Sequence, residues 1–597
     1  MIRDIMLAWD LDKSESFDPF IGLIIEALSA EIYTLTDNVT NIEVRLLDKL
    51  AKVLTPAIRT TAQPAHAILI TRPLEPKYLL TKEHPAYYDD TAFNKLNKVS
   101  NVIFSPVCDV PVFNGYVAYL ICNGTFYSVN EKAEKSVLEK FPREYTLNNA
   151  WIGLVMDKSI DSLKGLSFYI DFPHIRNRNE YLNLLQFTNW RIGNRIAKTK
   201  QGLDTSIAKS DGSLSETLSE YGIMGIIDKT IYRLYSKRFV SIDEDCINKP
   251  SVYPSELEPI IAQSETMQDQ LNQPLLWAQV SFPQSFISSI LDDMTICINA
   301  VPIAQKALKS KNQALIEHTN IIRLNVNENE HFLSVHSVTD SQNKQYREFL
   351  SDSSPDNGIG TYAIRHGGCE RFDSRDAKDY LYRLQDLLME ERAMFTSESK
   401  SKMTDITEQL LVLINRMEEA AASMEESREV PHYLIIDVQD TKGNIKTEYW
   451  ITNGTIGNGI SAGVPLIPFP QTPLDVKYTF LLTTSAGGKK PPSPEEKIWH
   501  YKKALLSGER IVTNEDIKCF CQAEYPGIFD HIEIRRGTAI SKRPQDGLIR
   551  TTDVHLLVAS RFANEIKEEN LVWTLEEKLK DKSPESYNYR IIIEYKE

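Results

Sequence analysis

The chain has 597 residues, of which 42% are hydrophobic and 25% are charged, as in an ordinary folded protein. At roughly 150 residues per domain, this length exceeds one hydrophobic core and predicts about three to four units. The formal net charge of −15 argues against general nucleic-acid binding, which requires a basic face. Seven scattered cysteines are typical of reduced thiols in the cytosol, not of a disulfide framework.

The sequence also argues against a membrane-spanning protein. No apolar run approaches the ~20 residues that cross a bilayer. The first ten residues have too short an apolar core for a signal peptide. We therefore expect a cytoplasmic protein with no direct membrane insertion.

Near the N-terminus, apolar residues recur at spacings of three and four between Phe17 and Pro56, which predicts helices that bury one stripe. Asp18-Pro19 is a helix start signal, and the capping box from Thr40 to Glu43 starts a second helix. We predict helices at 19–36 and 41–54, packed as a hairpin or a bent pair. The first helix contributes four apolar residues of the stripe: Ile21, Ile25, Leu28 and Ile32. This stripe is expected to be a core, and the alternative is that it is partly an interface with another protein.

Short apolar or β-branched runs between proline, glycine and asparagine predict strands in the rest of the chain. These runs lie at 67–71, 116–121, 151–155, 166–172, 276–282, 294–301, 321–326, 332–338, 433–438, 447–452, 528–535, 554–559 and 589–595. Further helices are predicted at 376–394, 404–424, 495–507 and 513–523.

The predicted class is therefore α+β and multidomain, with an N-terminal helical pair followed by several β-rich domains with helical insertions. We divide the chain into a helical segment (1–60), a β-rich domain with a helical and basic insertion (61–285), a middle α+β domain with two long helices (286–430) and a C-terminal α+β domain (431–597). The polar loops at 351–360 and 484–494 are candidate hinges.

No coherent catalytic, cofactor or metal site is predicted. Cys519 and Cys521 lie two apart in a predicted helix, where they point to different faces, and no second pair completes a zinc site. Arg365-His366-Gly367-Gly368-Cys369 is better read as a turn than as a Cys/His site. The glycines at 454, 457 and 459 match no phosphate-binding order, so turn chemistry accounts for them.

Two basic clusters stand out in this acidic chain. One lies between 176 and 200, and the other comprises Arg535, Arg536, Lys542, Arg543 and Arg550. Most charged runs are simply solvated surface, because exposed charges contribute little energy. The alternative is that Arg535, Arg536 and Arg550 help to bind an acidic protein partner.

Several stretches, in order, resemble the TssF family of type VI secretion baseplate wedge subunits. They are Asp18-Pro19 with Leu46–Leu50 and Leu54-Thr55-Pro56, then Ile298–Ala304, Phe332–Val338, Ile532–Gly537 and Gly547–Arg550. In addition, Gly508–Asp516 and Tyr525-Pro526-Gly527 resemble a segment of phage baseplate-wedge proteins. The chain departs from the family pattern because Asn299-Ala300 lacks the family's cysteine, and because the 376–428 helices and the tail after 560 have no counterpart. These departures indicate a divergent branch, of the Bacteroidetes type.

The resemblance implies a non-enzymatic scaffold without cofactors. Its implied partners are a TssG-like subunit, a second copy of itself, and TssE-, TssK- and VgrG-like components. The implied place is a cytoplasmic baseplate that other subunits dock at the inner membrane, where it seeds tube and sheath assembly. The alternatives are a wedge subunit of a phage tail or extracellular contractile injector, an enzyme with an unrecognised site, and a scaffold outside contractile machines.

Overall fold

A computed structural model describes the central and C-terminal parts of the chain. The described residues are 61–99, 101–142, 148–175, 178–193, 195–205, 222–246, 250–262, 264–284, 286, 288–314, 320–348, 360–366, 432–437, 444–470, 472–492, 510–525, 528–540, 548–558, 572, 575–576, 578–580, 582–584 and 588–595. The predicted helices at 19–36, 41–54, 376–394, 404–424 and 495–507 lie outside them, as do Ile21, Ile25, Leu28 and Ile32.

The protein is a mixed α+β chain with several sheets, as the sequence predicts. The described residues form two compact units, Ala62–Lys490 and the described part of the chain from Pro491 onward. No helix within the described residues is long and apolar enough to cross a membrane.

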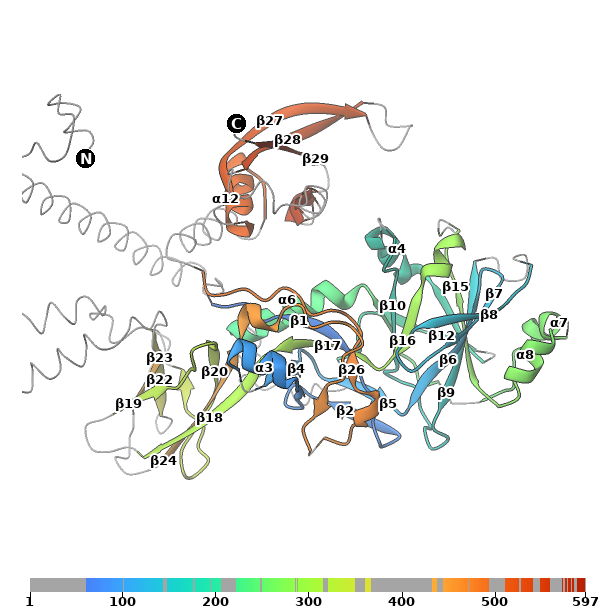
Figure 1. The fold of residues 1–597 in the computed structure, drawn as a ribbon, viewed down its shortest axis with the longest axis horizontal. Helices are drawn as coiled ribbons and strands as arrows, with labels where there is room; N and C mark the ends of the chain where they lie inside the picture. Colours follow the sequence, from blue (N-terminus) through green and yellow to red (C-terminus); the bar gives the residue numbers. More distant parts are fainter. Residues whose placement is uncertain are drawn as a thin grey trace, which may run out of the picture. The chain divides into compact units, whose positions relative to one another are not determined.

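One part of the larger unit is a pair of packed sheets (Figure 1). A seven-stranded sheet has the order β12-β11-β15-β9-β6-β7-β8, and a four-stranded sheet has the order β13-β14-β10-β16. The strands of the first are β6 (Gly115–Cys122), β7 (Thr125–Val129), β8 (Lys135–Lys140), β9 (Asn149–Met156), β11 (Asn189–Ile192), β12 (Arg195–Ala197) and β15 (Leu276–Ser281). The strands of the second are β10 (Ser167–Asp171), β13 (Thr199–Gln201), β14 (Phe239–Ile242) and β16 (Thr295–Ile298).

Both faces of the seven-stranded sheet are buried, which explains why its central strands are almost continuously apolar. Alternate residues such as Ile152 and Leu154 pack toward the four-stranded sheet, where they meet Phe168. Trp151 and Trp277 point the other way and pack under short helices. These helices are η5 (Ser255–Leu257), α7 (Glu258–Ile261) and α8 (Glu265–Gln270); α4 (Arg178–Leu184), η3 (Leu185–Phe187) and η6 (Ser288–Asp293) lie in the connections between strands.

A six-stranded sheet forms the centre of the larger unit, with the order β25-β3-β4-β17-β1-β26. Its strands are β1 (His66–Ile70), β3 (Ala86–Tyr88), β4 (Val102–Pro106), β17 (Ala300–Gln305), β25 (Ile467–Pro468) and β26 (Phe480–Leu481). The sheet thus combines strands from three of the four segments into which we divided the sequence, and that division stays a prediction. Helix α6 (Ile223–Ser236) packs Ile227, Ile231 and Tyr235 in the same core as Ile68 of β1. Smaller elements are α3 (Thr91–Asn97), the hairpin of β2 (Lys77–Leu80) with β5 (Val110–Phe113), η7 (Gly454–Gly457) and η8 (Val476–Tyr478).

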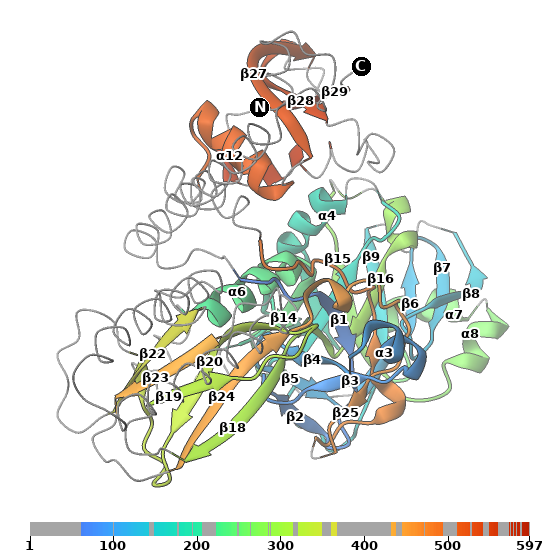
Figure 2. The same cartoon turned by 60° about the vertical axis from the view of Figure 1, so that its left-hand side comes forward.

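A further pair of small sheets follows in the same unit (Figure 2). One has the order β18-β24-β20 and the other has the order β19-β23-β22-β21. Their strands are β18 (Ala307–Ala314), β19 (Ile321–Leu324), β20 (His331–Thr339), β21 (Arg347–Glu348), β22 (Thr361–His366), β23 (His432–Asp437) and β24 (Asn444–Thr452). Ile322, Val338 and Leu434 are fully buried between them.

The C-terminal unit packs α12 (Asn514–Glu524) on a three-stranded sheet of β27 (Phe529–Ile540), β28 (Leu548–Val558) and β29 (Tyr589–Tyr595). Strand β28 pairs antiparallel with β27 and parallel with β29. As predicted, α12 begins after Thr513, whose side chain forms a capping box with Asp516. Cys519 and Cys521 are both buried in this helix.

The other predicted strands are confirmed, most with small shifts of their ends, although β27 and β28 extend well beyond the predicted 528–535 and 554–559. The prediction of one strand at 294–301 is wrong. Asn299 has φ 59° and separates β16 from β17, which belong to different sheets. The sequence also missed strands such as β18, whose residues are polar and alternate between half-buried and exposed. Residues 484–492 of the hinge candidate 484–494 are described. Within them, Lys489 is held to Gln63 by two backbone hydrogen bonds. The boundary between the two units nevertheless lies within that segment, after Lys490.

Candidate functional site

The three arginines of the predicted protein-interaction site lie on the β27–β28 hairpin, but they do not form one cluster. Arg535 stands opposite Asp553, whereas Arg536 stands opposite Thr552, and Arg550 stands opposite Thr538. Because successive side chains of a strand point to opposite faces, Arg535 lies on one face and Arg536 and Arg550 lie on the other. The four apolar residues of the same predicted site, at 21, 25, 28 and 32, lie outside the described residues.

The face with Arg535 already satisfies its charges. The Arg535 guanidinium donates from Nε and Nη2 to Glu533, at 2.9 and 2.7 Å. Beside it, the nearly buried Asp553 is held by Arg590 at 3.3 Å and accepts from the Thr551 hydroxyl at 2.7 Å. This face is a local ion-pair network, so Arg535 is a weak candidate for binding a partner.

Gly537 keeps that network intact. A Cβ atom at this position would overlap the Asp553 carboxylate, with Cγ only 2.6 Å away. Because the carboxylate is fixed by Arg590 and Thr551, a side chain at 537 must displace it from both.

We expect Gly537→Ala to lower the free energy of unfolding by about 2 kcal/mol, through overpacking and the loss of buried polar contacts. Thermal unfolding of the full chain measures the effect. The neighbouring exposed Thr538→Ala is the control and should change stability by less than about 0.5 kcal/mol. Equal effects of the two substitutions would show that the Asp553 contact is unimportant.

A second notable group of charges is buried in the larger unit. Lys306 Nζ lies 2.7 Å from Asp228 Oδ1, and Lys82 Nζ lies 3.2 Å from Oδ2 of the same carboxylate. The Lys306 side chain is 1% exposed and its ammonium lies 5.0 Å from the centre of the Trp450 ring. Burial lowers the pKa of Lys306, and the Asp228 charge partly offsets this shift. Sequence reasoning missed this cluster because its three ionic residues come from 82, 228 and 306.

The structure also explains Asn299, which the sequence singled out only through its family resemblance. Its side chain accepts from Phe113 N at 2.8 Å and donates to Phe113 O at 2.6 Å and Gly115 O at 3.2 Å. The residue is 4% exposed and adopts the left-handed conformation that asparagine tolerates better than most residues. Asn299 therefore locks the ends of β5 and β6 to the turn between β16 and β17.

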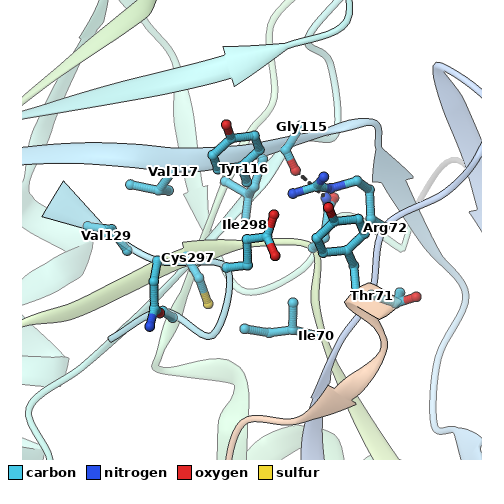
Figure 3. A pocket seen from close by; sticks show the side chains of 14 residues that line it. Ile70, Thr71, Arg72, Gly115, Tyr116, Val117, Val129, Cys297 and Ile298 are labelled. Carbon is cyan, nitrogen blue, oxygen red and sulfur yellow. Dashed lines mark hydrogen bonds between the residues drawn. The ribbon is translucent and has the colours of Figure 1, made fainter. Parts of the chain in front are cut away.

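A small cavity lies beside this turn (Figure 3). Its volume is about 30 Å³, which is the space of a single water molecule. The Arg72 guanidinium lies 4.6 Å from the ring centre of Tyr116 and 3.8 Å from that of Tyr478. The cavity is far smaller than the ~300 Å³ or more of a typical ligand pocket. We assign Arg72 to packing between aromatic rings and not to substrate binding.

A partly buried histidine gives the larger unit a pH-dependent contact. His66 Nδ1 lies 2.8 Å from the Tyr235 hydroxyl. Burial, together with the nearby Arg238, lowers the pKa of His66 from 6.5 to about 4. Between these values the unfolded chain binds a proton that the folded chain excludes.

We therefore expect the free energy of unfolding to fall by up to about 3 kcal/mol as the pH drops from 6.5 to 4. Above pH 6.5 the residue should contribute no pH dependence. Urea denaturation as a function of pH measures the effect, with His66→Gln as the control. A variant that keeps the full acid-induced loss would assign that loss to other groups.

The residues that the sequence weighed for chemistry do not converge. Within the described residues, no group of three or more His, Cys, Asp or Glu side chains could hold a metal ion. Arg365 and His366 end strand β22, and the remainder of that motif lies outside the described residues. Gly454 and Gly459 have φ of 56° and 80° around the short helix η7, which confirms the predicted turn chemistry.

Comparison with known proteins finds likeness only among solved structures. No protein-family model matches the chain, and no curated protein sequence matches it. Among solved structures, the chain is similar to a chain of the "type VI secretion system TssK-TssF-TssG baseplate subcomplex", solved by cryo-electron microscopy. The likeness covers 96% of each chain, with 11% sequence identity and a TM-score of 0.42. These values establish neither the fold nor the function of this chain.

The segments of the resemblance that the structure describes lie in the framework of both units. Ile298–Ala304 contains the Asn299 turn and most of β17, and Phe332–Val338 lies within β20. Ile532–Gly537 lies in β27, and Gly508–Asp516 reaches the capping box of α12. Each described segment thus has a clear role in building a sheet, a hairpin or a helix start.

Proposed function

We propose that this protein is a non-enzymatic structural subunit of a contractile-injection baseplate, of the TssF type. The observation that carries the proposal is the order of the family-like segments along the chain, together with their placement at framework positions such as the Asn299 turn. Buried polar turns and capped helices fix how sheets and helices join, which is what a scaffold requires.

The finer proposal is a wedge in which this chain binds a TssG-like subunit and a second copy of itself. The wedge would surround a VgrG-like hub, with TssE- and TssK-like components, and would seed tube and sheath assembly. The protein would be cytoplasmic, held at the inner membrane by other subunits and using no cofactor. This proposal rests on the resemblance of the sequence to the family.

Co-expression with a TssG-like protein from the same genome is the direct test. We expect the two to purify together as one species of defined mass that further binds TssE- or TssK-like proteins. A monomer that binds none of them would contradict the proposal.

The paired substitutions Ile25→Asp and Ile32→Asp refine the test, because they should unfold the chain if the N-terminal stripe is a core. If the stripe is an interface, the same variant should remain folded but fail to assemble.

A second candidate is a wedge subunit of a phage tail or an extracellular contractile injector. The specific observation is the stretch Gly508–Asp516, whose Thr513–Asp516 capping box starts α12. The same co-purification separates the two candidates, because a phage or extracellular injector would supply tail proteins in place of TssK-like ones.

A further inference from the structure

The end of the β27–β28 hairpin extends beyond the rest of its unit. Strand β29 begins at Tyr589, which pairs with Thr552. From Gly537 opposite Thr551 to Ile540 opposite Leu548, no third strand pairs with the hairpin among the described residues (Figure 1). The buried cluster under α12 includes Ile532 and Val554 but no residue of this two-stranded end.

One face of this end carries both basic and apolar side chains. Strand alternation places Arg536, Thr538, Leu548 and Arg550 on the same side, and we call these four residues the hairpin face. All four are exposed, and Leu548 is 75% exposed. Arg536 and Arg550 are diagonal neighbours across the pair, within the reach of long side chains. Within the described residues, neither guanidinium forms an ion pair.

Such an extension is costly for an isolated chain. A two-stranded ribbon by itself is at best marginally stable in water. The exposed side chain of Leu548 contributes no hydrophobic stabilisation. Covering an apolar side chain contributes about 25 cal/mol of favourable free energy per Å² removed from water. An interaction that covers Leu548 and pairs the two arginines would stabilise the ribbon on both counts.

We propose that the hairpin face binds an extended, acidic segment of a protein partner. Two carboxylates of that segment pair with Arg536 and Arg550, and an apolar side chain next to them covers Leu548, which lies beyond Arg550 toward the turn of the hairpin. The proposal deepens the proposed function and rests on it, with a neighbouring subunit of the assembly as the source of the segment. Arg535 is excluded from the interaction because it lies on the opposite face and is already paired with Glu533.

Nucleic acid is the less favoured occupant. The chain carries a net charge of −15, and backbone recognition of nucleic acid requires many cations along one face. An exposed leucine on the same strand face as two arginines instead fits a protein segment that carries both acidic and apolar residues.

The test uses the full chain and a short fluorescent peptide in which glutamate alternates with leucine. We expect salt-sensitive binding that weakens about tenfold in the Arg536→Gln, Arg550→Gln double variant. Leu548→Ser should weaken binding as well, without changing its salt dependence. Arg535→Gln is the matched control, since it removes one arginine from the same hairpin and should leave the affinity unchanged.

Three results would overturn the proposal. The first is that Arg535→Gln weakens peptide binding as much as the double variant does. The second is that the double variant binds the peptide with unchanged affinity. The third is that single-stranded DNA binds as tightly as the peptide. Circular dichroism identifies any variant that fails to fold. If the double glutamine variant fails, the double variant Arg536→Lys, Arg550→Lys takes its place. This variant keeps both positive charges and should weaken binding less. Failure of the proposed function is distinguishable, because the chain would then bind the peptide but would not assemble with a TssG-like subunit. Conversely, a double variant that assembles with wild-type salt resistance would overturn this proposal alone.

Discussion

Replacing Asp228 with alanine is expected to lower the free energy of unfolding by about 3–5 kcal/mol, the typical cost of leaving a buried charge unpaired. Lys306 is 1% exposed and Asp228 is its ion-pair partner at 2.7 Å. Lys82 cannot replace that partner because it is also a cation. Urea denaturation followed by tryptophan fluorescence reports on the site, since Trp450 lies beside Lys306.

Two substitutions of the lysines serve as controls. Lys82→Ala should cost at most about 1 kcal/mol, because the Lys82 side chain is 43% exposed and water screens its charge. Lys306→Met removes the buried charge and keeps its volume, so it should cost much less than Asp228→Ala. An Asp228→Ala effect no larger than that of Lys82→Ala would contradict the assignment.

The same cluster predicts how the effect of Asp228→Ala depends on pH. Burial already lowers the pKa of Lys306 in the folded protein, and removing the Asp228 charge lowers it further. Between the folded and unfolded pKa values the unfolded chain binds more protons, so folding becomes more favourable as the pH rises. The stability difference between Asp228→Ala and wild type should therefore shrink as the pH rises from 7 toward the ordinary lysine pKa. A difference that stays constant would mean that the charge of Lys306 is not its cause.

Asn299→Ala is expected to destabilise the larger unit by about 4 kcal/mol. The loss has two causes: the buried hydrogen bonds of the Asn299 side chain disappear, and alanine tolerates the left-handed backbone conformation less well than asparagine does. The substitution leaves Phe113 N without its Asn299 acceptor, and Phe113 O without its donor, in a buried position. Asn299→Gly should recover about 1 kcal/mol of this loss, because glycine relieves only the backbone strain.

Asn343 provides a matched control for the backbone term. It has φ 60°, almost the same as the 59° of Asn299, but it lies exposed in the turn after β20. Asn343→Ala should therefore cost only about 1 kcal/mol. If the two alanine variants lost the same stability, the hydrogen bonds of Asn299 to Phe113 and Gly115 would have no net effect.

The sequence predicted local structure well wherever the local signal was strong. The apolar and β-branched runs at β1, β6, β9 and β15 identified strands whose residues are buried. The helix predicted at 513–523 is confirmed as α12, and the structure shows that a Thr513–Asp516 capping box fixes its start. Polar strands such as β18 were missed, since a strand held mainly by its pairing with β24 carries no apolar pattern.

The sequence by itself thus determined the α+β class, most buried strands and the position of a basic cluster between 535 and 550. Only the tertiary structure decided that Asn299 ends one strand and begins another, because its hydrogen-bond partners lie 184 and 186 residues away. The same holds for Lys306 and Asp228, which are 78 residues apart and form an ion pair only when α6 packs beside β17. On the hairpin, strand register placed Arg535 on one face and Arg536 with Arg550 on the other. The physical reason is common to all three: burial, pairing and facing are set by contacts between distant residues, which local sequence patterns do not encode.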